Sequence, residues 1–216
     1  MVDGVVHPTW RRRGLGRRLL ARIGQEAHQA GAASLEIRVS EDEPAARGFC
    51  QALGFHVART WYRMWLHPVR VPAYSFPPGY SWRHYRSFHD AADYVRIVNA
   101  TLSGHWGVEP ITLDSVASLV RQPAFHPANI LFTTQGREIV GVSTQRFIER
   151  QVNGHTLTAT HIGPVGVSTA HRGLGLGHAL VAATLRQARR GNIQAAELDV
   201  DEGNGPAIHV YQDCGL

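Results

Sequence analysis

The stretch that decides the fold reads Val167-Ser168-Thr169-Ala170-His171-Arg172-Gly173-Leu174-Gly175-Leu176-Gly177. It follows an apolar run, has an arginine five residues after Val167, and ends in three glycines at alternate positions. A segment with helical periodicity comes next, with apolar side chains on one face. Glycines at the start of a helix let backbone N–H groups converge on an anion, and the helix dipole adds positive potential. The stretch therefore predicts a phosphate or pyrophosphate site.

The same pattern occurs a second time near the start of the chain. It reads Val6-His7-Pro8-Thr9-Trp10-Arg11-Arg12-Arg13-Gly14-Leu15-Gly16, which lies 161 residues earlier without a gap. Both stretches fit V-x(4)-R-x-x-G-x-G, and the same offset pairs Glu36 with Glu197 and Gly54 with Gly215. A period of this length is the size of a domain. We therefore expect parts of two copies of one domain in tandem.

A proline-rich segment separates the two copies. Four prolines between Pro68 and Pro78 interrupt the periodicity and mark a linker. We expect residues 1–70 to be the C-terminal part of a first, degenerate domain, residues 71–79 a linker, and residues 80–216 a second domain that lacks its last strands. Two interpretations follow from that incomplete sheet. Either the strand-rich stretch 57–66 fills the missing edge, or the chain is a fragment of a longer protein, which we favour.

The second copy predicts an α+β domain. Helices are expected at 90–102, 112–121, about 174–190 and 205–214, and strands at 80–85, 129–134, 138–149, 157–167 and 195–200. Three of these strands are joined by short turns and form an antiparallel meander, while the helix after them makes a crossover to a parallel strand. The fold class is a mixed, mostly antiparallel sheet flanked by helices, present in two incomplete copies.

Composition narrows the class of protein. The apolar fraction is 44%, and no run of about 18 apolar residues exists, so we expect a soluble cytoplasmic protein with no membrane partner. The two cysteines and thirteen histidines show no metal-ligand spacing, which predicts no metal site. The net charge of +5 favours an anionic partner. The chain has no lysine, which excludes a Walker A loop.

The two loops resemble the acyl-CoA loop of the GNAT superfamily, and the resemblance covers most of residues 4–67 and 80–216. A dinucleotide-binding fold is the rival interpretation, but the glycine spacing differs and antiparallel strands precede the loop. The tandem arrangement is similar to that of mycothiol synthase and its relatives. The resemblance implies acetyl-CoA or another acyl-CoA as co-substrate. The implied contact residues are Val165, Gly166, Val167, Arg172, Gly173, Leu174, Gly175, Leu176, Gly177 and Asn204, with Arg11, Gly14, Leu15 and Gly16 in the first copy.

The resemblance also implies an acid for the reaction. GNAT members often carry N-x-x-A-x-x-x-Y-x-x-x-G-F, and the second copy matches it from Asn204 through Tyr211, with Leu216 at the last position. The Tyr211 hydroxyl is expected to protonate the departing thiolate. In the first copy Glu43 and Cys50 replace the asparagine and the tyrosine. We therefore expect the first site to be degenerate.

A base is needed because an alkyl amine is mostly protonated at neutral pH. His161, on the strand before the loop, and Glu149, on the preceding strand, are the two candidates. Acceptor recognition is expected from the loop 103–109 and from Phe147, as in the family that the loops resemble.

The resulting hypothesis is an N-acyltransferase that acts on an amine of a small molecule or peptide and not on nucleic acid. The alternative is a catalytically inactive CoA-binding or protein-interaction module, which the incomplete pair of domains motivates. A nucleic-acid binder is a third possibility, motivated by the arginines in and after the first loop. These are Arg11, Arg12, Arg13, Arg17, Arg18 and Arg22.

Overall fold

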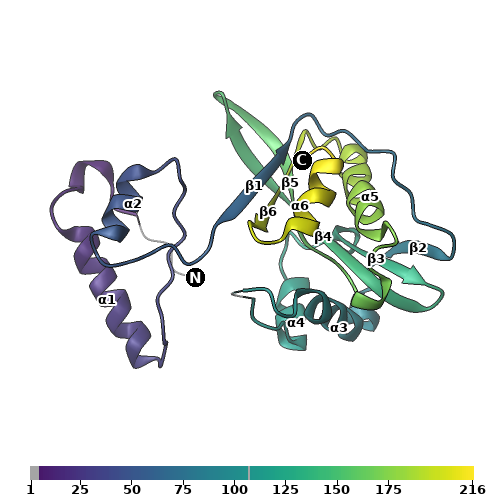
Figure 1. Ribbon diagram of the computed structural model, residues 1–216, viewed down its shortest axis with the longest axis horizontal. Coiled ribbons are helices and arrows are strands. Elements are labelled where there is room, and N and C mark those ends of the chain that lie inside the picture. The colour runs from purple at the N-terminus through teal and green to yellow at the C-terminus, as the bar shows by residue number, and fades with distance from the viewer. Residues whose placement is uncertain (1–4, 107) are drawn as a thin grey trace. The chain divides into compact units, whose positions relative to one another are not determined.

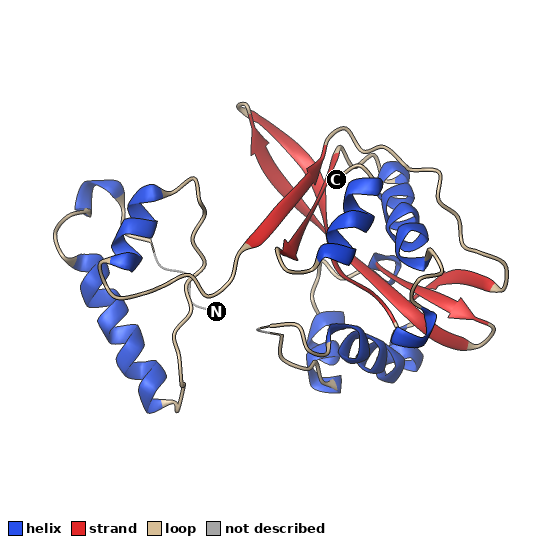
Figure 2. Ribbon diagram, in the orientation of Figure 1, coloured by secondary structure: helices blue, strands red, loops and turns tan. Residues whose placement is uncertain are grey.

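The computed structural model describes residues 5–106 and 108–216, and it divides the chain into two compact units, Met1–Ala58 and Arg59–Leu216. The second unit contains one six-stranded sheet in the order β1-β6-β5-β4-β3-β2 (Figures 1 and 2). The strands are β1 Trp61–Leu66, β2 Tyr80–His84, β3 Ile130–Gln135, β4 Glu138–Val152, β5 His155–Val167 and β6 Ala195–Asp201. Among these described strands, only β5 and β6 pair in parallel. The predicted mixed, mostly antiparallel sheet is confirmed.

Helices cover both faces of this sheet. They are η2 Ser87–Asp90, α3 Ala91–Leu102, α4 Leu113–Val120, η3 Pro127–Asn129, η4 Thr169–His171, α5 Leu176–Arg190 and α6 Gly205–Asp213. On one face α3 and α4 bury Ile97 and Val116 against Phe132 of β3. On the other face α5 and α6 bury a second apolar cluster, in which Leu185 packs with Leu198 of β6. In β3, neighbouring residues therefore enter different clusters, with Phe132 packed under α3 and α4 and Leu131 packed against residues of α5.

Strand β1 lies in the stretch that the sequence predicts to belong to the first copy, residues 1–70, yet it pairs into the sheet of the second unit. It pairs with β6 over its whole length, from Trp61 opposite Asp201 to Leu66 opposite Ala196. This pairing fills the open edge of the sheet, as one of the two interpretations expects, while the fragment interpretation stays a prediction. The strand is shorter than the stretch 57–66, and the unit boundary falls between Ala58 and Arg59 rather than at residues 71–79. Those residues connect β1 to β2 inside the second unit.

The first unit is helical. It contains η1 Pro8–Trp10, α1 Leu15–Gln29 and α2 Pro44–Gln51. The repeat predicts a strand near Glu36–Val39, the counterpart of β6, but no strand is assigned among the described residues of this unit. That expectation is wrong because a strand is stable only when its backbone groups pair with a neighbour. None of the described residues 5–58 is fully buried, so this unit has no closed core of its own.

Candidate active site

The second unit has a fork between its two parallel strands. The β5–β6 ladder contains only three pairs, and the last joins His161 to Glu197. Beyond that rung β5 pairs with β4 as far as Val167, while β6 pairs with β1 as far as Asp201. The edge of β5 that faced β6 therefore carries no ladder bonds after His161. At the vertex of the fork, the predicted base His161 lies beside Glu197, an acidic residue to which the sequence assigns no role in the reaction.

The glycine-rich loop lies between β5 and α5. Gly173 and Gly175 have φ angles of 79° and 75°, a left-handed conformation that glycine adopts without strain. Gly175 is the N-cap of α5, which begins at Leu176 rather than at Leu174. The Arg172 Nε group donates to the Val167 carbonyl at 3.1 Å and so braces the turn.

The amides of this loop are available to a ligand. Within the described residues, the N–H groups from Leu174 to Gly177 donate to no backbone or side-chain acceptor. These are the free amides expected at a helix start, and an anion can satisfy them. The geometry is compatible with the predicted pyrophosphate contacts, whose role stays a prediction.

The first loop repeats this local geometry in the first unit. Gly14 is the N-cap of α1 with φ 76°, and Arg11 Nε donates to the Val6 carbonyl at 3.0 Å. The counterpart of the fork is not formed, since no strand is assigned in the described part of this unit. The first copy therefore has the loop without the strands that would hold the rest of an acyl-CoA.

The candidate base His161 belongs to a buried cluster. Its Nδ1 lies 2.9 Å from Glu197 Oε1. Arg150 of β4 donates to both oxygens of the same carboxylate, from Nη2 to Oε1 at 2.6 Å and from Nε to Oε2 at 2.7 Å. The Glu197 side chain is 1% exposed, against 16% for His161 and 35% for Arg150. Because a buried carboxylate is costly unless it is paired, these three side chains form one unit.

The charge state of this cluster follows from its contacts. Burial acts to raise the pKa of the Glu197 carboxyl, but the hydrogen bonds from Arg150 and His161 outweigh it, so this pKa lies below its usual value. Glu197 is therefore ionised at neutral pH. An ionised carboxylate only accepts hydrogen bonds, so His161 Nδ1 carries the proton between them.

The second candidate base, Glu149, is not part of this cluster. Glu149 lies opposite Thr158, one rung from Arg150, and its side chain is exposed. Because neighbouring residues of a strand point to opposite faces of the sheet, Glu149 projects from the face opposite that of Arg150 and His161. Phe147 also lies on that face and is 49% exposed. Only His161 of the two candidates sits at the fork.

Tyr211 reaches the fork region from the α5–α6 side. It is 9% exposed and packs in the cluster that contains Leu198 and Val200, which lie on the face opposite Glu197. Burial raises the pKa of its hydroxyl to about 12, with a further contribution from Cys214. The phenol therefore keeps its proton at neutral pH. His161 and Tyr211 lie on opposite sides of the sheet where β5 and β6 separate.

Asn204 connects α6 to the loop after α3. Its Oδ1 accepts from the Ala207 amide at 3.3 Å and caps α6, while its Nδ2 lies 3.4 Å from His105 Nε2. Of the predicted acceptor loop, Gly107 lies outside the described residues and Trp106 is 38% exposed. Asn204 thus has a structural role as a cap, and its predicted contact with the cofactor stays a prediction.

Val165 and Gly166 line β5 on its two faces. Val165 packs against the clusters under α5. Gly166 faces α3, where an added Cβ atom would lie 2.4 Å from the Thr101 Cβ. No side chain fits there, so this glycine is required by helix packing.

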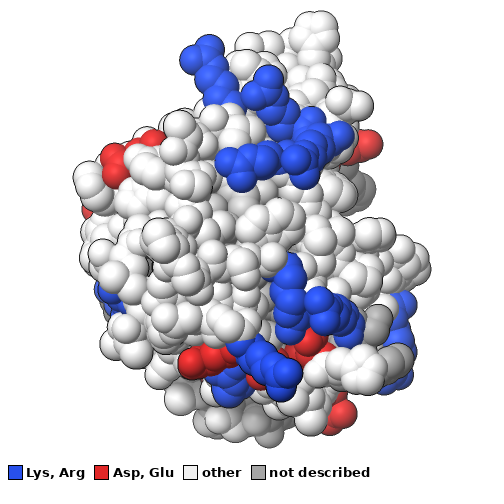
Figure 3. All heavy atoms as spheres, turned by 90° about the vertical axis from the view of Figure 1, so that its right-hand side faces the viewer, with Lys and Arg blue, Asp and Glu red and all other residues white. Residues whose placement is uncertain are grey.

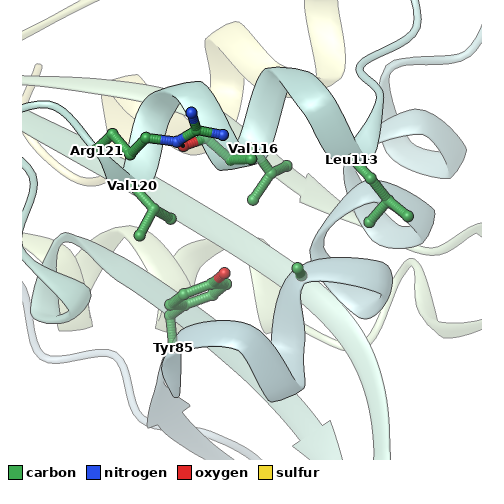
Figure 4. Close-up of a pocket in the computed structure, with 7 residues that line it drawn as sticks. Tyr85, Leu113, Val116, Val120 and Arg121 are labelled. Carbon is green, nitrogen blue, oxygen red and sulfur yellow. Dashed lines mark hydrogen bonds between the residues drawn. The ribbon is translucent and has the colours of Figure 1, made fainter.

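A separate hollow lies away from the fork, at α4 (Figure 4). It has a volume of about 270 Å³ and is lined by Tyr85, Ala91, Leu113, Val116, Ala117, Val120 and Arg121. Arg121 donates through Nε to the Ala117 carbonyl. This lining is almost wholly apolar and offers no counterpart of the polar cluster at the fork.

On the one face shown in Figure 3, the positive charge is divided rather than continuous. On the face shown in Figure 3 the arginines gather in two groups with a wide uncharged area between them, and acidic side chains lie among the lower group. Several arginines of the second unit are paired, including Arg63 with Asp199 and Arg83 with Asp90. No described helix is both long and apolar enough to cross a bilayer.

Comparison with known proteins identifies relatives of both units. The model of the acetyltransferase (GNAT) family matches residues 65–216, and that of a GNAT acetyltransferase domain matches residues 3–57. A mycothiol acetyltransferase from Thermobispora bispora is 29% identical over 214 residues, which is 98% of this chain and 70% of the relative. These matches confirm the resemblance read from the two loops.

Solved structures agree on the fold. A GCN5-related N-acetyltransferase from Sphaerobacter thermophilus has a TM-score of 0.71 at 24% identity, over 97% of this chain and 66% of that one. A tandem GNAT protein from the clavulanic acid biosynthesis pathway has a TM-score of 0.63 at 23% identity, over 98% and 69%. The chain thus spans about two thirds of the length of these proteins.

Proposed function

The chain belongs to the acetyltransferase (GNAT) family, and from that premise we propose that its second unit transfers an acetyl group from acetyl-CoA to a primary amine at the β5–β6 fork. The observation that carries this proposal is the placement of His161 at the last rung of the parallel ladder, with the free amides of Leu174–Gly177 at the other end of β5. A base and an anion site thus flank one open strand edge.

Binding of acetyl-CoA is supported by two features of the chain. The amides at the start of α5, together with the helix dipole, suit the pyrophosphate. The open edge of β5 offers backbone groups between Ile162 and Val167 that an extended amide-containing arm can pair with.

The two side chains of the proposed chemistry act on opposite sides of the sheet. His161 Nε2 accepts a proton from the amine as its nitrogen forms a bond to the acetyl carbon and the carbon–sulfur bond breaks. Tyr211 stays protonated, and a thiol has an ordinary pKa of about 8.5, so complete transfer from a phenol of pKa about 12 is uphill. We therefore assign Tyr211 the donation of a hydrogen bond to the departing sulfur.

The acceptor class is the finer part of the proposal. The relative from Thermobispora bispora is named a mycothiol acetyltransferase, which makes the unacetylated amine precursor of mycothiol the first acceptor to test. Simple amines, amino sugars and peptide N-termini complete the panel.

The test is turnover of acetyl-CoA with this panel, followed by chromatography of the acetylated amine. With the best acceptor, Tyr211→Phe should lower kcat by about 100-fold, because it removes one positioned donor. The control is Tyr94→Phe, which removes another deeply buried hydroxyl of pKa about 12 from the α3 core. Equal rates for Tyr211→Phe and the wild type would contradict the assignment of Tyr211. Binding of acetyl-CoA without turnover of any amine would favour the inactive binding module.

A further inference from the structure

We propose that Glu197, held in place by Arg150, is a positioning residue that fixes the ring orientation and tautomer of His161. The inference rests on the proposed function for its catalytic meaning, whereas the contacts that carry it belong to the chain alone. Neither residue lies in the glycine-rich loop or in the motif that runs from Asn204 to Leu216. The role is indirect, since Glu197 is buried behind His161.

The contacts leave His161 one orientation. Glu197 accepts all its hydrogen bonds from protein groups, because its side chain is 1% exposed and Arg150 and His161 occupy both oxygens. The guanidinium binds the carboxylate through two parallel N–H groups, a geometry that fixes its plane. The carboxylate then receives the Nδ1–H group of His161, and Nε2 of the neutral ring is left with its lone pair free.

The position of the cluster relates this arrangement to the fork. His161 and Glu197 are directly opposite each other at the last rung, so the ring is fixed where the two strands separate. On the other side of β6, Trp65 of β1 lies opposite Glu197. Strand β1 therefore closes the edge of the sheet beside the cluster.

The charged groups around His161 indicate that Glu197 orients the imidazole ring rather than acting on it as an unpaired negative charge. Glu197 faces it from β6, and Arg150 and Arg146 face it from β4, with the Arg63–Asp199 pair one step further along β1 and β6. On α3, Asp93 and Arg96 pair with each other. Since Arg150 offsets the charge of Glu197, the pair holds the ring without adding a large net negative potential.

The test removes both Glu197 and Arg150, so that neither charge is left buried without its partner. In the full chain, Glu197→Leu with Arg150→Met replaces a buried ion pair by apolar side chains, a change that folded proteins often tolerate. The control is Asp199→Asn with Arg63→Gln, which removes the neighbouring two-bond pair of β6 and β1. Thermal unfolding establishes that both variants fold.

The deciding readout is the nitrogen-15 spectrum of the His161 ring, assigned by comparison with His161→Gln. In the wild type and the control, Nδ1 should carry the proton of the neutral ring, while in the Glu197/Arg150 variant both tautomers should appear. With acetyl-CoA and the best amine of the panel, kcat of that variant should fall roughly 100-fold, with the Kd for acetyl-CoA unchanged. A His161 ring with the wild-type tautomer in the Glu197/Arg150 variant would overturn the inference. Failure of the wild type to bind acetyl-CoA would instead refute the proposed function.

Discussion

Gly166 shows that a residue of the predicted cofactor site can also be needed for packing. It lies in β5 beside the proposed cofactor arm, and α3 approaches it so closely that an added Cβ would come within 2.4–2.9 Å of three atoms of Thr101. By contrast, a Cβ at Gly177 would meet only Val210, at 3.7 Å. The first glycine is needed for packing, and the second leaves room at the start of α5.

This contrast predicts different outcomes for the same substitution. Gly166→Ala should lower the free energy of unfolding by about 1–3 kcal/mol, because the methyl group overpacks the contact with Thr101. Gly177→Ala should leave it nearly unchanged, since alanine suits a helix and the space is open. Urea unfolding of the two variants checks this, and equal stability would show that α3 can move away from β5.

The pairing of buried carboxylates predicts the pH dependence of stability. The pKa of Asp90 is lowered like that of Glu197, because the bonds from Arg83 and the Arg86 amide outweigh burial. Their ordinary values are 3.8 and 4.5. The unfolded chain therefore binds more protons in acid, and this stability is present above pH 4.5 and lost as the pH falls through the folded-state values.

The measurement is the free energy of unfolding in urea between pH 7 and pH 3. It should decrease below about pH 4.5, and the decrease should be smaller in Asp90→Asn, which has no carboxyl to titrate. If the free energy of unfolding of Asp90→Asn fell as steeply below about pH 4.5 as that of the wild type, Asp90 would not contribute to the pH dependence of stability.

At the residue scale, the sequence predicts the site residues that belong to a motif of neighbouring residues along the chain. The loop glycines and Tyr211 could be named because their neighbours along the chain define them. Glu197 and Arg150 could not, because the bond between them joins residues 47 positions apart and depends on the register of three strands. The same register separates Glu149 from His161, which no spacing along the sequence could show.

At the scale of elements, helices and strands of the second unit follow their local signals. The capping box at Thr112 with Ser115 starts α4, and Asn204 starts α6. The failed strand near Glu36–Val39 has the same pattern as β6, so its absence comes from the lack of a partner. The sequence offers the place of β1 at the open edge only as one of two interpretations, since an edge strand is specified by the sheet that it joins.

The cap of α6 gives a prediction at this scale. Asn204→Ala should lower the free energy of unfolding by about 1 kcal/mol, because the Ala207 amide loses its acceptor. Asn204→Ser should lose much less, since serine caps nearly as well. Thermal unfolding compares the two, and equal losses would indicate that the contact with His105 matters more than the cap.

At the scale of the whole molecule, the second unit contains its complete apolar core. All three buried clusters draw their residues from the range 66–216, with Leu66 of β1 among them. The linker predicted from the prolines, residues 71–79, lies after β1, whereas the boundary seen in the structure lies before it. The stabilities of two truncated chains distinguish the predicted boundary from the observed one.

Residues 59–216 should fold cooperatively and keep the fork, whereas residues 71–216 should be less stable. The shorter chain loses six rungs of pairing with β6, exposes the edge beside Glu197, and removes Leu66 from its cluster. Thermal unfolding followed by circular dichroism measures both. Equal melting temperatures would contradict the assignment of β1 to the second sheet.

The measurement that tests the central claim most directly is calorimetric titration of the whole chain with acetyl-CoA, comparing Gly177→Asp with Gly177→Asn. Position 177 accepts a Cβ, and an acidic residue in the first turn is favourable for a helix, so both variants should fold. We predict that the asparagine variant binds acetyl-CoA and that the aspartate variant does not, because its charge meets the pyrophosphate at the amides of α5. Equal affinities in the two variants would contradict a cofactor site at this loop.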